Sequence, residues 1–300
     1  MSTRFEIVLH GENPVSLRAA GEEAFDEIQR LEARLSLYCD SSEIAHVNAR
    51  AVLEPVRVSP GVFRLLAQAA SLSAETGGAF DITIGPLMKC WGFVRGSGQL
   101  PDPASLTAAR AGVGMSLVEL DATNFTVRFK REGVMLDLGA IGKGHAVGVA
   151  AEVLREAGVS SALIHGGTSS VFALGHPPDA EAWKVAIEQT AEDRDAAGTL
   201  LAVVPLCDEA LSVSAVWGKS FQSGGKNFGH VIDPRTGEPA ERALLAAVVL
   251  PDSTQADALS TALLTLGPAG TEMLQRIRPA SRSVVIAHDR VVRSHGIPLG

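Results

Sequence analysis

Apolar residues recur at helical spacing in four stretches of the chain. In the first stretch they lie four, three and four residues apart, which places them on one face of a helix that ends near Leu37. The positions on this face are Ala24, Ile28, Leu31 and Leu35. Three later stretches each stop at glycine, and two of them also carry typical start residues, Ser-Pro in one and an Asp/Gln capping pair in the other. These predicted helices cover residues 60–76, 143–157 and 254–266.

Short apolar runs of the β type predict strands at the N-terminus and from residue 125 onward. They cover residues 1–9, 125–129, 134–138, 162–164, 171–174, 183–187 and 244–250. Strands and helices do not alternate strictly, so the pattern favours an α+β fold with mixed or antiparallel sheets and packed helices over a doubly wound parallel sheet. Residues 95–103 are rich in Gly and Pro and predict a surface loop. No linker is evident, so residues 1–300 are expected to form a single domain.

Composition places the chain among globular proteins. It has 300 residues, of which 46% are hydrophobic and 20% charged, and this balance excludes an intrinsically disordered chain. The net charge is −8 and no basic stripe is present, so a nucleic-acid partner is not expected. No run is long enough to span a membrane, and the first residues lack the apolar core of a secretory signal. A cytoplasmic location is therefore expected for the chain as it stands, and a periplasmic one if an export segment has been removed.

The three cysteines do not suggest a disulfide framework or a metal site. Cys39, Cys90 and Cys207 are odd in number, lie far apart and form no CxxC pair. Buried thiols are the expected state. HExxH and GxSxG motifs are also absent, which removes zinc proteases and serine hydrolases from consideration.

One candidate ligand site lies in the segment GGAFDITIGPL, residues 77–87, which is soon followed by WGF at 91–93. Small residues beside Phe80 and Asp81 allow a flat ring to approach the backbone, while the carboxylate accepts hydrogen bonds. The same residues are also typical of a helix stop, a turn and a strand start. Both interpretations remain open from the residues alone.

A second candidate is the segment LDLGAIGKG, residues 136–144, in which a predicted strand leads through a glycine-rich turn into a helix. Backbone N–H groups at a helix N-terminus suit phosphate, and Lys143 would add a positive charge. Asp137 precedes the turn. The spacing is neither a Walker A loop nor GxGxxG, so a phosphate site and an ordinary glycine turn are both compatible with it.

A third candidate is the pair Asp257 and Thr261 near the start of the last predicted helix. Residues four apart are neighbours on one helical face, and a carboxylate with a hydroxyl offers hard oxygen ligands that suit Mg²⁺. The alternative is an Asp placed near a helix start for capping or for the helix dipole.

Two further segments are turns with reactive residues beside them. In GHVIDPRTG, residues 229–237, the DPRTG portion predicts a tight turn, and His230 is either a packed histidine or a proton-transfer group. In IHGGTSS, residues 164–170, small polar residues predict a turn at a strand end.

In this order, these segments resemble the ApbE family, the FAD:protein FMN transferases, from Thr3 to about Gly267. The motifs that carry the resemblance are GGAFDITIGPL with WGF, LDLGAIGKG, HVIDPRTG and DALSTALLTLG. The resemblance implies an ApbE-like, T-fold-related architecture that forms a single catalytic domain over residues 1–300.

The resemblance also implies a role for individual residues. Asp257 and Thr261 would be the side-chain ligands of Mg²⁺, and the main-chain carbonyl of Ala140 would be a third ligand. His230 is the histidine expected to assist proton transfer, and Val231 would line the cofactor with its backbone. The other residues expected to contact FAD are Tyr38, which would pack on the flavin, and Ala79, Phe80, Asp81, Asp137 and Lys143.

The activity implied is Mg²⁺-dependent transfer of FMN from FAD to a Thr or Ser hydroxyl of an acceptor flavoprotein, with release of AMP. Two alternatives share the same site: a Mg²⁺-dependent FAD pyrophosphatase that gives FMN and AMP, and a non-catalytic FAD-binding protein. The chain departs from the family pattern at Gly166-Gly167-Thr168, at Ser214-Ala215 and at Met1-Ser2-Thr3. The identity of the acceptor is not encoded in these residues.

Overall fold

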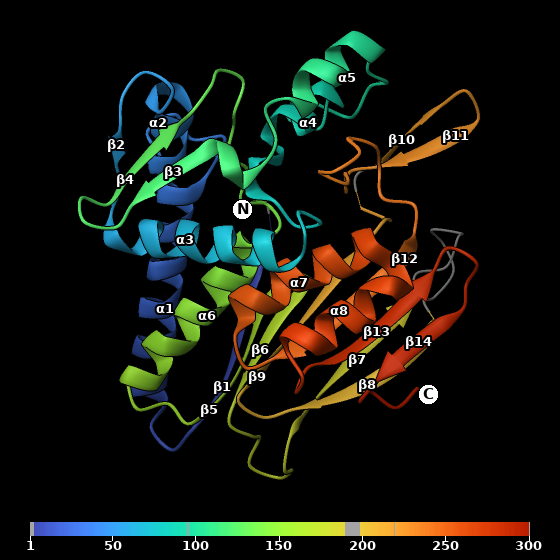
Figure 1. Ribbon diagram of the computed structural model, residues 1–300. Helices are drawn as coiled ribbons and strands as arrows, with labels where there is room; N and C mark the ends of the chain where they lie inside the picture. The colour runs from blue at the N-terminus through green and yellow to red at the C-terminus, as the bar shows by residue number, and fades with distance from the viewer. Residues whose placement is uncertain (1–2, 95, 190–198, 219, 300) are drawn as a thin grey trace. The chain divides into compact units, whose positions relative to one another are not determined.

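The computed structural model describes residues 3–94, 96–189, 199–218 and 220–299 (Figure 1). The chain divides into two compact units. Unit 1 comprises Met1–Leu31, Ile141–Ala215 and Ala243–Gly300, and unit 2 comprises Glu32–Ala140 and Val216–Arg242. The expectation of a single catalytic domain over residues 1–300 stays a prediction.

Unit 1 is built on a seven-stranded sheet in which all neighbouring strands are antiparallel. The strand order is β1-β5-β6-β9-β12-β13-β14. The strands are β1 (Phe5–His10), β5 (Ser161–Gly166), β6 (Ser170–Leu174), β9 (Glu209–Ala215), β12 (Ala243–Leu250), β13 (Arg282–Ala287) and β14 (Val292–His295). A separate antiparallel pair is formed by β7 (Trp183–Gln189) and β8 (Thr199–Leu206).

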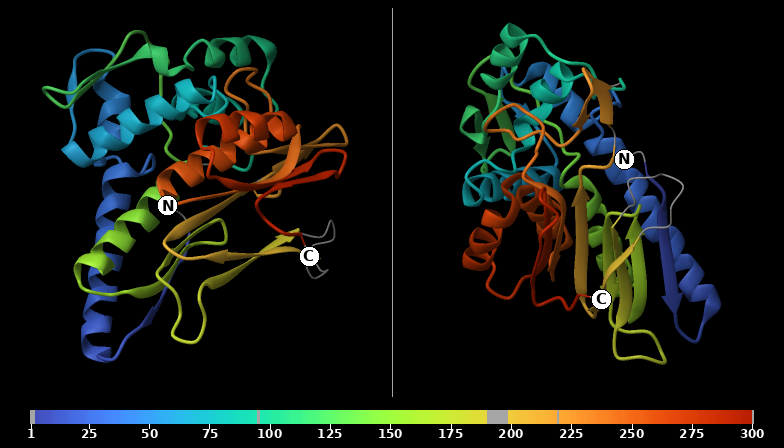
Figure 2. Two further views of the ribbon diagram at one scale, coloured as in Figure 1. Left: turned by 60° about the horizontal axis from the view of Figure 1, so that its bottom comes forward. Right: turned by 90° about the vertical axis from the view of Figure 1, so that its right-hand side faces the viewer.

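Two helices pack beside each other on this sheet, as the views in Figures 1 and 2 show. Helix α6 (Gly142–Glu156) contacts β5 and β6, and helix α7 (Ser253–Leu266) contacts β9 and β12. Unit 1 also contains α8 (Gly270–Ile277), which packs on α7, and most of α1 (Pro14–Leu35). Eleven of the 14 residues of α7 are buried, so its polar side chains must find partners inside the protein.

Unit 2 combines short helices with a small sheet. The three-stranded antiparallel sheet has the order β2-β4-β3. The elements of this unit are α2 (Glu43–Arg50), β2 (Val56–Arg57), α3 (Pro60–Glu75), α4 (Gly85–Cys90), α5 (Pro103–Arg110), β3 (Val118–Asp121), β4 (Thr126–Phe129) and the hairpin of β10 (Ser220–Ser223) and β11 (Lys226–Gly229), with 3₁₀ turns at Ile82–Ile84 and Met115–Leu117.

Aromatic side chains form a core cluster in unit 2. Trp91 and Phe93 are buried together with Leu87 and Ile232. The β10–β11 hairpin adds Phe221 and Phe228, whose rings stack with centroids 5.3 Å apart. The ring of Phe228 also lies 5.6 Å from that of Trp91. Segments that are about 130 residues apart in the sequence are thus held together by ring packing.

The four predicted helices are confirmed as α1, α3, α6 and α7. The capping pair of α7 is present, because Asp252 accepts the Gln255 backbone N–H and the Gln255 side-chain amide. The strands predicted at 125–129, 162–164, 171–174, 183–187 and 244–250 are β4, β5, β6, β7 and β12. The first strand is β1; residues 1 and 2 of that prediction lie outside the described residues, as does residue 95 of the predicted 95–103 loop.

The strand predicted at 134–138 is wrong. These residues belong to no helix or strand, and several of their backbone groups are bonded outside any sheet. The side chain of Asn48 accepts the Leu136 N–H at 2.7 Å and donates to the Leu136 carbonyl at 2.9 Å. The Asp137 N–H donates to the carbonyl of Ile82, and the carbonyl of Met135 accepts the Gly85 N–H. Contacts from distant segments therefore replace the ladder of a neighbouring strand.

The cysteine prediction is also corrected. All three thiols are free, but Cys39 and Cys90 are only half-buried and Cys207 is exposed. Among the described residues, no helix is long and apolar enough to cross a membrane.

Candidate active site

Asp257 and Thr261 lie one turn apart on α7, as their spacing predicts. The N-cap of this helix is Asp252, so Asp257 lies inside the helix and is not its cap. The capping alternative is therefore wrong. Asp257 is only 3% exposed, and a buried carboxylate must be compensated by donors or by a cation.

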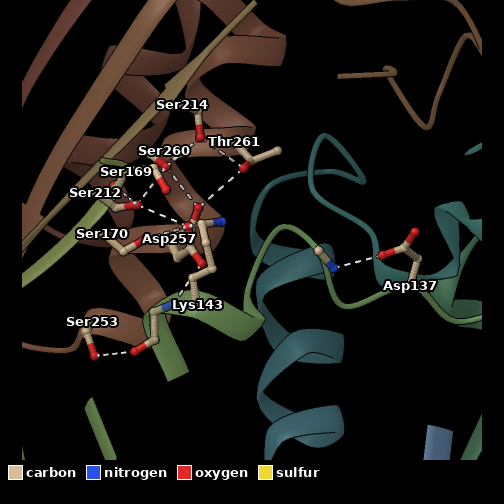
Figure 3. A network of polar contacts seen from close by, with 12 residues as sticks. Asp137, Lys143, Ser169, Ser170, Ser212, Ser214, Ser253, Asp257, Ser260 and Thr261 are labelled. Atoms are coloured by element: carbon tan, nitrogen blue, oxygen red, sulfur yellow. Dashed lines mark hydrogen bonds and ion pairs between the residues drawn. The ribbon is translucent and has the colours of Figure 1, made fainter. Parts of the chain in front are cut away.

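Hydroxyl, amide and ammonium groups surround the Asp257 carboxylate (Figure 3). Its Oδ1 atom accepts the hydroxyl of Ser212 at 3.1 Å and that of Ser170 at 3.4 Å. The Lys143 ammonium lies 3.8 Å from the same oxygen. The other oxygen, Oδ2, accepts the backbone N–H of Gly144 at 2.9 Å. The charge is thus held by donors from α6, β6 and β9.

The Thr261 hydroxyl belongs to a chain of hydroxyl groups. Its Oγ1 lies 3.1 Å from the Oγ of Ser214, which in turn lies 2.8 Å from the Oγ of Ser260. Ser260 donates to the Asp257 backbone carbonyl at 2.9 Å. The two predicted ligand side chains are therefore connected through serine hydroxyls of β9 and α7.

Glycine at position 144 lets α6 approach α7. A Cβ atom at this position would lie 2.2 Å from the Ser253 carbonyl oxygen and 2.6 Å from the Asp257 Cβ. Ser253 also donates its hydroxyl to the Gly144 carbonyl at 2.7 Å. This close approach allows the N-terminus of α6 to present Lys143 and the Gly144 N–H to Asp257.

The residues around Asp257 fit a hard divalent cation. Besides the Lys143 ammonium and the Gly144 N–H, the groups near the carboxylate are hydroxyl oxygens, and oxygen ligands are those that Mg²⁺ prefers. These hydroxyls belong to Thr261, Ser170, Ser212 and Ser214. The described residues contain no cluster of three or more His, Cys, Asp or Glu side chains, so zinc-type or multi-carboxylate sites are not indicated there.

Asp137 and the turn that follows it belong to unit 2. The Asp137 carboxylate accepts the Gly139 N–H at 2.8 Å (Figure 3). Burial raises the pKa of Asp137 above the ordinary value, and the Gly139 hydrogen bond lowers it by a smaller amount. The turn covers residues 139–141, and its Ala140 is the last residue of the first of the two segments that make up unit 2. Asn48, which sequence analysis missed, fixes the preceding backbone through Leu136.

Asp81 is the centre of a hydrogen-bonded turn. Its carboxylate accepts the hydroxyls of Ser73 and Thr83 and the backbone N–H groups of Thr83 and Met115, at 2.5–3.0 Å. Ala79 and Phe80 beside it are buried. The predicted helix stop and turn are confirmed, but the strand start is wrong, because the 3₁₀ turn Ile82–Ile84 and helix α4 follow Asp81. The contact of Asp81 with FAD stays a prediction.

The HVIDPRTG segment forms the predicted turn. The Asp233 carboxylate accepts the Arg235 N–H at 2.9 Å and pairs with its guanidinium through two bonds, which raises the pKa of Arg235. The Trp91 indole N–H donates to the Gly237 carbonyl at 2.8 Å. WGF and DPRTG, two motifs far apart in the sequence, are therefore joined directly.

His230 lies at the end of the β10–β11 hairpin and is half-buried. Its ring is 6.4 Å from that of Phe93 in an edge-to-face arrangement. A Cβ at Gly218 would lie 2.4 Å from the His230 Cε1, so the backbone passes close to the imidazole. The next residue, Val231, accepts the Ala240 N–H through its carbonyl at 2.8 Å.

Tyr38 follows the end of α1 and is 48% exposed, which is unusual for a large aromatic side chain. Its backbone N–H donates to Ser36 Oγ. The exposed ring is compatible with the predicted flavin contact.

Unit 1 thus gathers Lys143, Asp257 and Thr261 into one network, whereas the other predicted site residues belong to unit 2. Sequence analysis gave the serines of that network no role at this site, although Ser170 ends the IHGGTSS segment and Ser214 lies at a departure from the family pattern. The Ser212-x-Ser214 spacing lies in a stretch with no strand prediction, and isolated serines are common in loops.

Known proteins resemble this chain in sequence and in fold. The model of the ApbE family matches residues 1–284. The FAD:protein FMN transferase of Treponema pallidum is 31% identical over 98% of this chain and 84% of its own length. That of Haemophilus influenzae is 31% identical over 84% of this chain and 75% of its own. The crystal structure of Pseudomonas stutzeri flavinyl transferase ApbE, in its apo form, has a TM-score of 0.83 and 28% identity, and covers 97% of this chain and 91% of its own.

Proposed function

This chain belongs to the ApbE family, and on that premise we propose that it transfers the FMN half of FAD to a Thr or Ser hydroxyl of an acceptor protein, with Mg²⁺ bound and with release of AMP. Relatives that share about 30% of their residues with this chain are named FAD:protein FMN transferases. The chain is accordingly a flavin transferase that uses FAD and acts on a protein.

The observation that carries the finer proposal is the oxygen-rich network around Asp257. Asp257 and Thr261 are the side chains that would hold Mg²⁺, with the Ala140 carbonyl as the third proposed ligand. A storage protein has no need of a buried carboxylate of this kind, because binding FAD does not require a cation at its pyrophosphate. When bound, Mg²⁺ would neutralise charge on the non-bridging phosphate oxygens.

The proposed reaction is an attack by the acceptor hydroxyl on the phosphorus of the FMN half. A new P–O bond forms to the Thr or Ser oxygen, and the P–O bond to AMP breaks, so AMP leaves with the bridging oxygen. His230 accepts the hydroxyl proton, a contribution of about 10²–10⁴-fold for a well-placed base. The Lys143 ammonium offers a positive charge to the pyrophosphate.

The remaining proposed contacts orient FAD. Tyr38 packs its exposed ring on the flavin, and the Val231 backbone lines the same cofactor. The 79–81 turn and Asp137 supply fixed backbone and carboxylate groups. Because Asp81 already accepts four hydrogen bonds, the shape of its turn is fixed before FAD binds.

The test is to incubate the purified protein with FAD and Mg²⁺, without and with a candidate acceptor that exposes a Thr. The acceptor mass and the formation of AMP are measured. An FMN-sized adduct together with AMP supports the proposal. A matched acceptor with Thr replaced by Val is expected to gain no adduct, because it lacks the attacking hydroxyl.

Two results would contradict the proposal. FMN and AMP without an adduct on any Thr- or Ser-containing acceptor of the tested set would indicate a pyrophosphatase. Tight FAD binding with no AMP formed, in Mg²⁺ and with acceptor present, would indicate a binding protein.

A further inference from the structure

Strand β9 carries two serines, Ser212 and Ser214, to which no role has been given in the proposed reaction. They are two residues apart, so their side chains point to the same face of the sheet. That face packs against α7, since β9 and α7 are in contact. Ser212 is 1% exposed and Ser214 is half-buried.

Ser212 acts on the carboxylate of Asp257. It is the cross-strand partner of Ser170 on β6, and both hydroxyls reach Asp257 Oδ1. Ser212 also lies 3.2 Å from the Ser169 carbonyl, but a hydroxyl has one proton, and a bond to a carboxylate is stronger than one to a neutral carbonyl. Ser212 and Ser170 therefore fix the Oδ1 atom of the carboxylate, while the Gly144 N–H fixes Oδ2.

Ser214 acts on the hydroxyl of Thr261. A threonine oxygen that binds a cation with its lone pair must direct its proton elsewhere. The Oγ of Ser214 lies 3.1 Å from Thr261 Oγ1, closer than the Asp257 carbonyl at 3.4 Å. Ser214 can then donate to Ser260 at 2.8 Å, and Ser260 to the Asp257 carbonyl at 2.9 Å. In this chain of hydrogen bonds Thr261, Ser214 and Ser260 each donate their one hydroxyl proton once, and the last acceptor is a carbonyl, which needs no proton of its own.

We propose that Ser212 and Ser214 are positioning residues for the cation site. Ser212 sets the orientation of the Asp257 carboxylate. Ser214 accepts a hydrogen bond from the Thr261 hydroxyl, so that the Thr261 lone pairs face the cation. This inference rests on the proposed function, because it takes Asp257 and Thr261 as Mg²⁺ ligands. One face of one strand thus orients both ligand side chains, which α7 alone would leave free to change rotamer.

The test is Mn²⁺ binding to the full-length protein, measured from the electron paramagnetic resonance signal of the free ion with and without FAD. The variants are Ser212→Ala and Ser214→Ala. Each is expected to weaken Mn²⁺ binding by about 10-fold or more, the usual effect of losing a hydrogen bond to a metal ligand. Ser214→Thr keeps the hydroxyl at a half-buried position and is expected to bind Mn²⁺ nearly as the parent protein does.

The matched control is Ser283→Ala. Ser283 is equally buried on β13 of the same sheet and has no place in the network. It is expected to leave Mn²⁺ binding unchanged. Thermal unfolding of every variant separates loss of folding from loss of the site, and the half-buried Ser214 keeps the test available if Ser212→Ala does not fold.

A second readout is the Mg²⁺ dependence of transfer. Positioning residues are expected to raise the Mg²⁺ concentration needed for half-maximal rate by about 10-fold while the rate at saturating Mg²⁺ changes little. If both alanine variants bind Mn²⁺ as tightly as the parent, the positioning proposal is wrong and the proposed function stands. If the parent protein binds no Mn²⁺ either with or without FAD, the assignment of Asp257 and Thr261 as metal ligands fails, and this inference fails with it.

Discussion

A single buried carboxylate, Asp257, determines the polar chemistry of unit 1. A carboxylate on a residue that is 3% exposed carries a large desolvation cost, and here two serine hydroxyls, one backbone N–H and the Lys143 ammonium offset it. Removing the side chain altogether would leave these donors without their acceptor. The informative substitution is therefore the one that keeps the shape and removes the charge.

Asp257→Asn is expected to lower FMN transfer by at least about 100-fold, because a neutral amide is a poor ligand for Mg²⁺ and leaves the phosphate charge less neutralised. The thermal unfolding temperature should change little, since the amide oxygen can still accept the Gly144 N–H. Transfer rates over a Mg²⁺ titration measure the effect. The matched control is Asp252→Asn at the N-cap of the same helix, where Asn caps as well as Asp and transfer should persist. Full activity of Asp257→Asn would remove Asp257 from the metal site.

Asp137 predicts a pH-dependent change in stability. Burial raises its pKa in the native state, so the native protein binds the proton more tightly than the unfolded chain does. The charged carboxylate therefore costs stability above its native pKa, and this cost disappears as the pH falls below the unfolded value of about 3.9. Asp137→Asn, which keeps an oxygen for the Gly139 N–H, is expected to be more stable than the parent at pH 7.

The measurement is the difference in unfolding temperature between the Asp137→Asn variant and the parent, from pH 7 down to about pH 4. The difference should shrink as the pH falls. FAD binding should weaken in the variant, because the carboxylate is a proposed FAD contact. A difference that is independent of pH would show that burial of charge is not the cause.

At the scale of elements, the contact between α6 and α7 depends on a missing side chain. Gly144 lies against the backbone of Ser253 and the Cβ of Asp257, and neither can move as the end of a flexible side chain can. Gly142, two residues earlier in the same helix, has open space where a Cβ would be. Gly144 and Gly142 therefore form a matched pair of positions, because an added Cβ would disturb the contact between α6 and α7 only at Gly144.

Gly144→Ala is expected to destabilise the protein by about 1–3 kcal/mol, the usual range for overpacking a buried contact, and to reduce transfer because the Lys143–Asp257 arrangement is displaced. Gly142→Ala should be neutral or stabilise by up to about 1 kcal/mol, since alanine is the better helix former. Chemical denaturation of both variants gives the comparison. Equal effects of the two substitutions would contradict the packing argument.

At the scale of the whole molecule, an acidic chain of net charge −8 binds an anionic substrate, so the local cations must outweigh the overall charge. Asp257, a carboxylate at the proposed phosphate site, adds to this repulsion until a cation is present. Binding of FAD and of Mg²⁺ should therefore be mutually favourable, and each should stabilise the native state in proportion to its occupancy.

FAD at about 100 times its dissociation constant is expected to add about 2.7 kcal/mol to the free energy of unfolding, which corresponds to a rise of about 4 °C in unfolding temperature for a chain of 300 residues. The rise should be smaller in EDTA than in Mg²⁺. Thermal unfolding monitored by circular dichroism checks both points. In Asp257→Asn the Mg²⁺-dependent part should be lost while some FAD-dependent part remains. An identical FAD effect in EDTA and in Mg²⁺ would contradict the proposed coupling.

The sequence by itself determined the elements with strong local signals. Helices α3, α6 and α7 have apolar periodicity and clear end residues, and the DPRTG turn follows from its own Asp, Pro and Gly. The pairing of Asp257 with Thr261 also needed only the helical repeat. Local hydrogen bonding and helix geometry act over a few residues, so the order of residues suffices to predict them.

Only the tertiary structure decided what those residues touch. Residues 134–138 have the apolar pattern of a strand, yet Asn48 and Ile82 supply the backbone partners that a neighbouring strand would have given. The serines of β6 and β9 became partners of Asp257 because antiparallel pairing places Ser170 opposite Ser212 beneath α7. Such contacts depend on strand register and on the close approach at Gly144. Both depend on packing between distant segments, which no short stretch of sequence specifies.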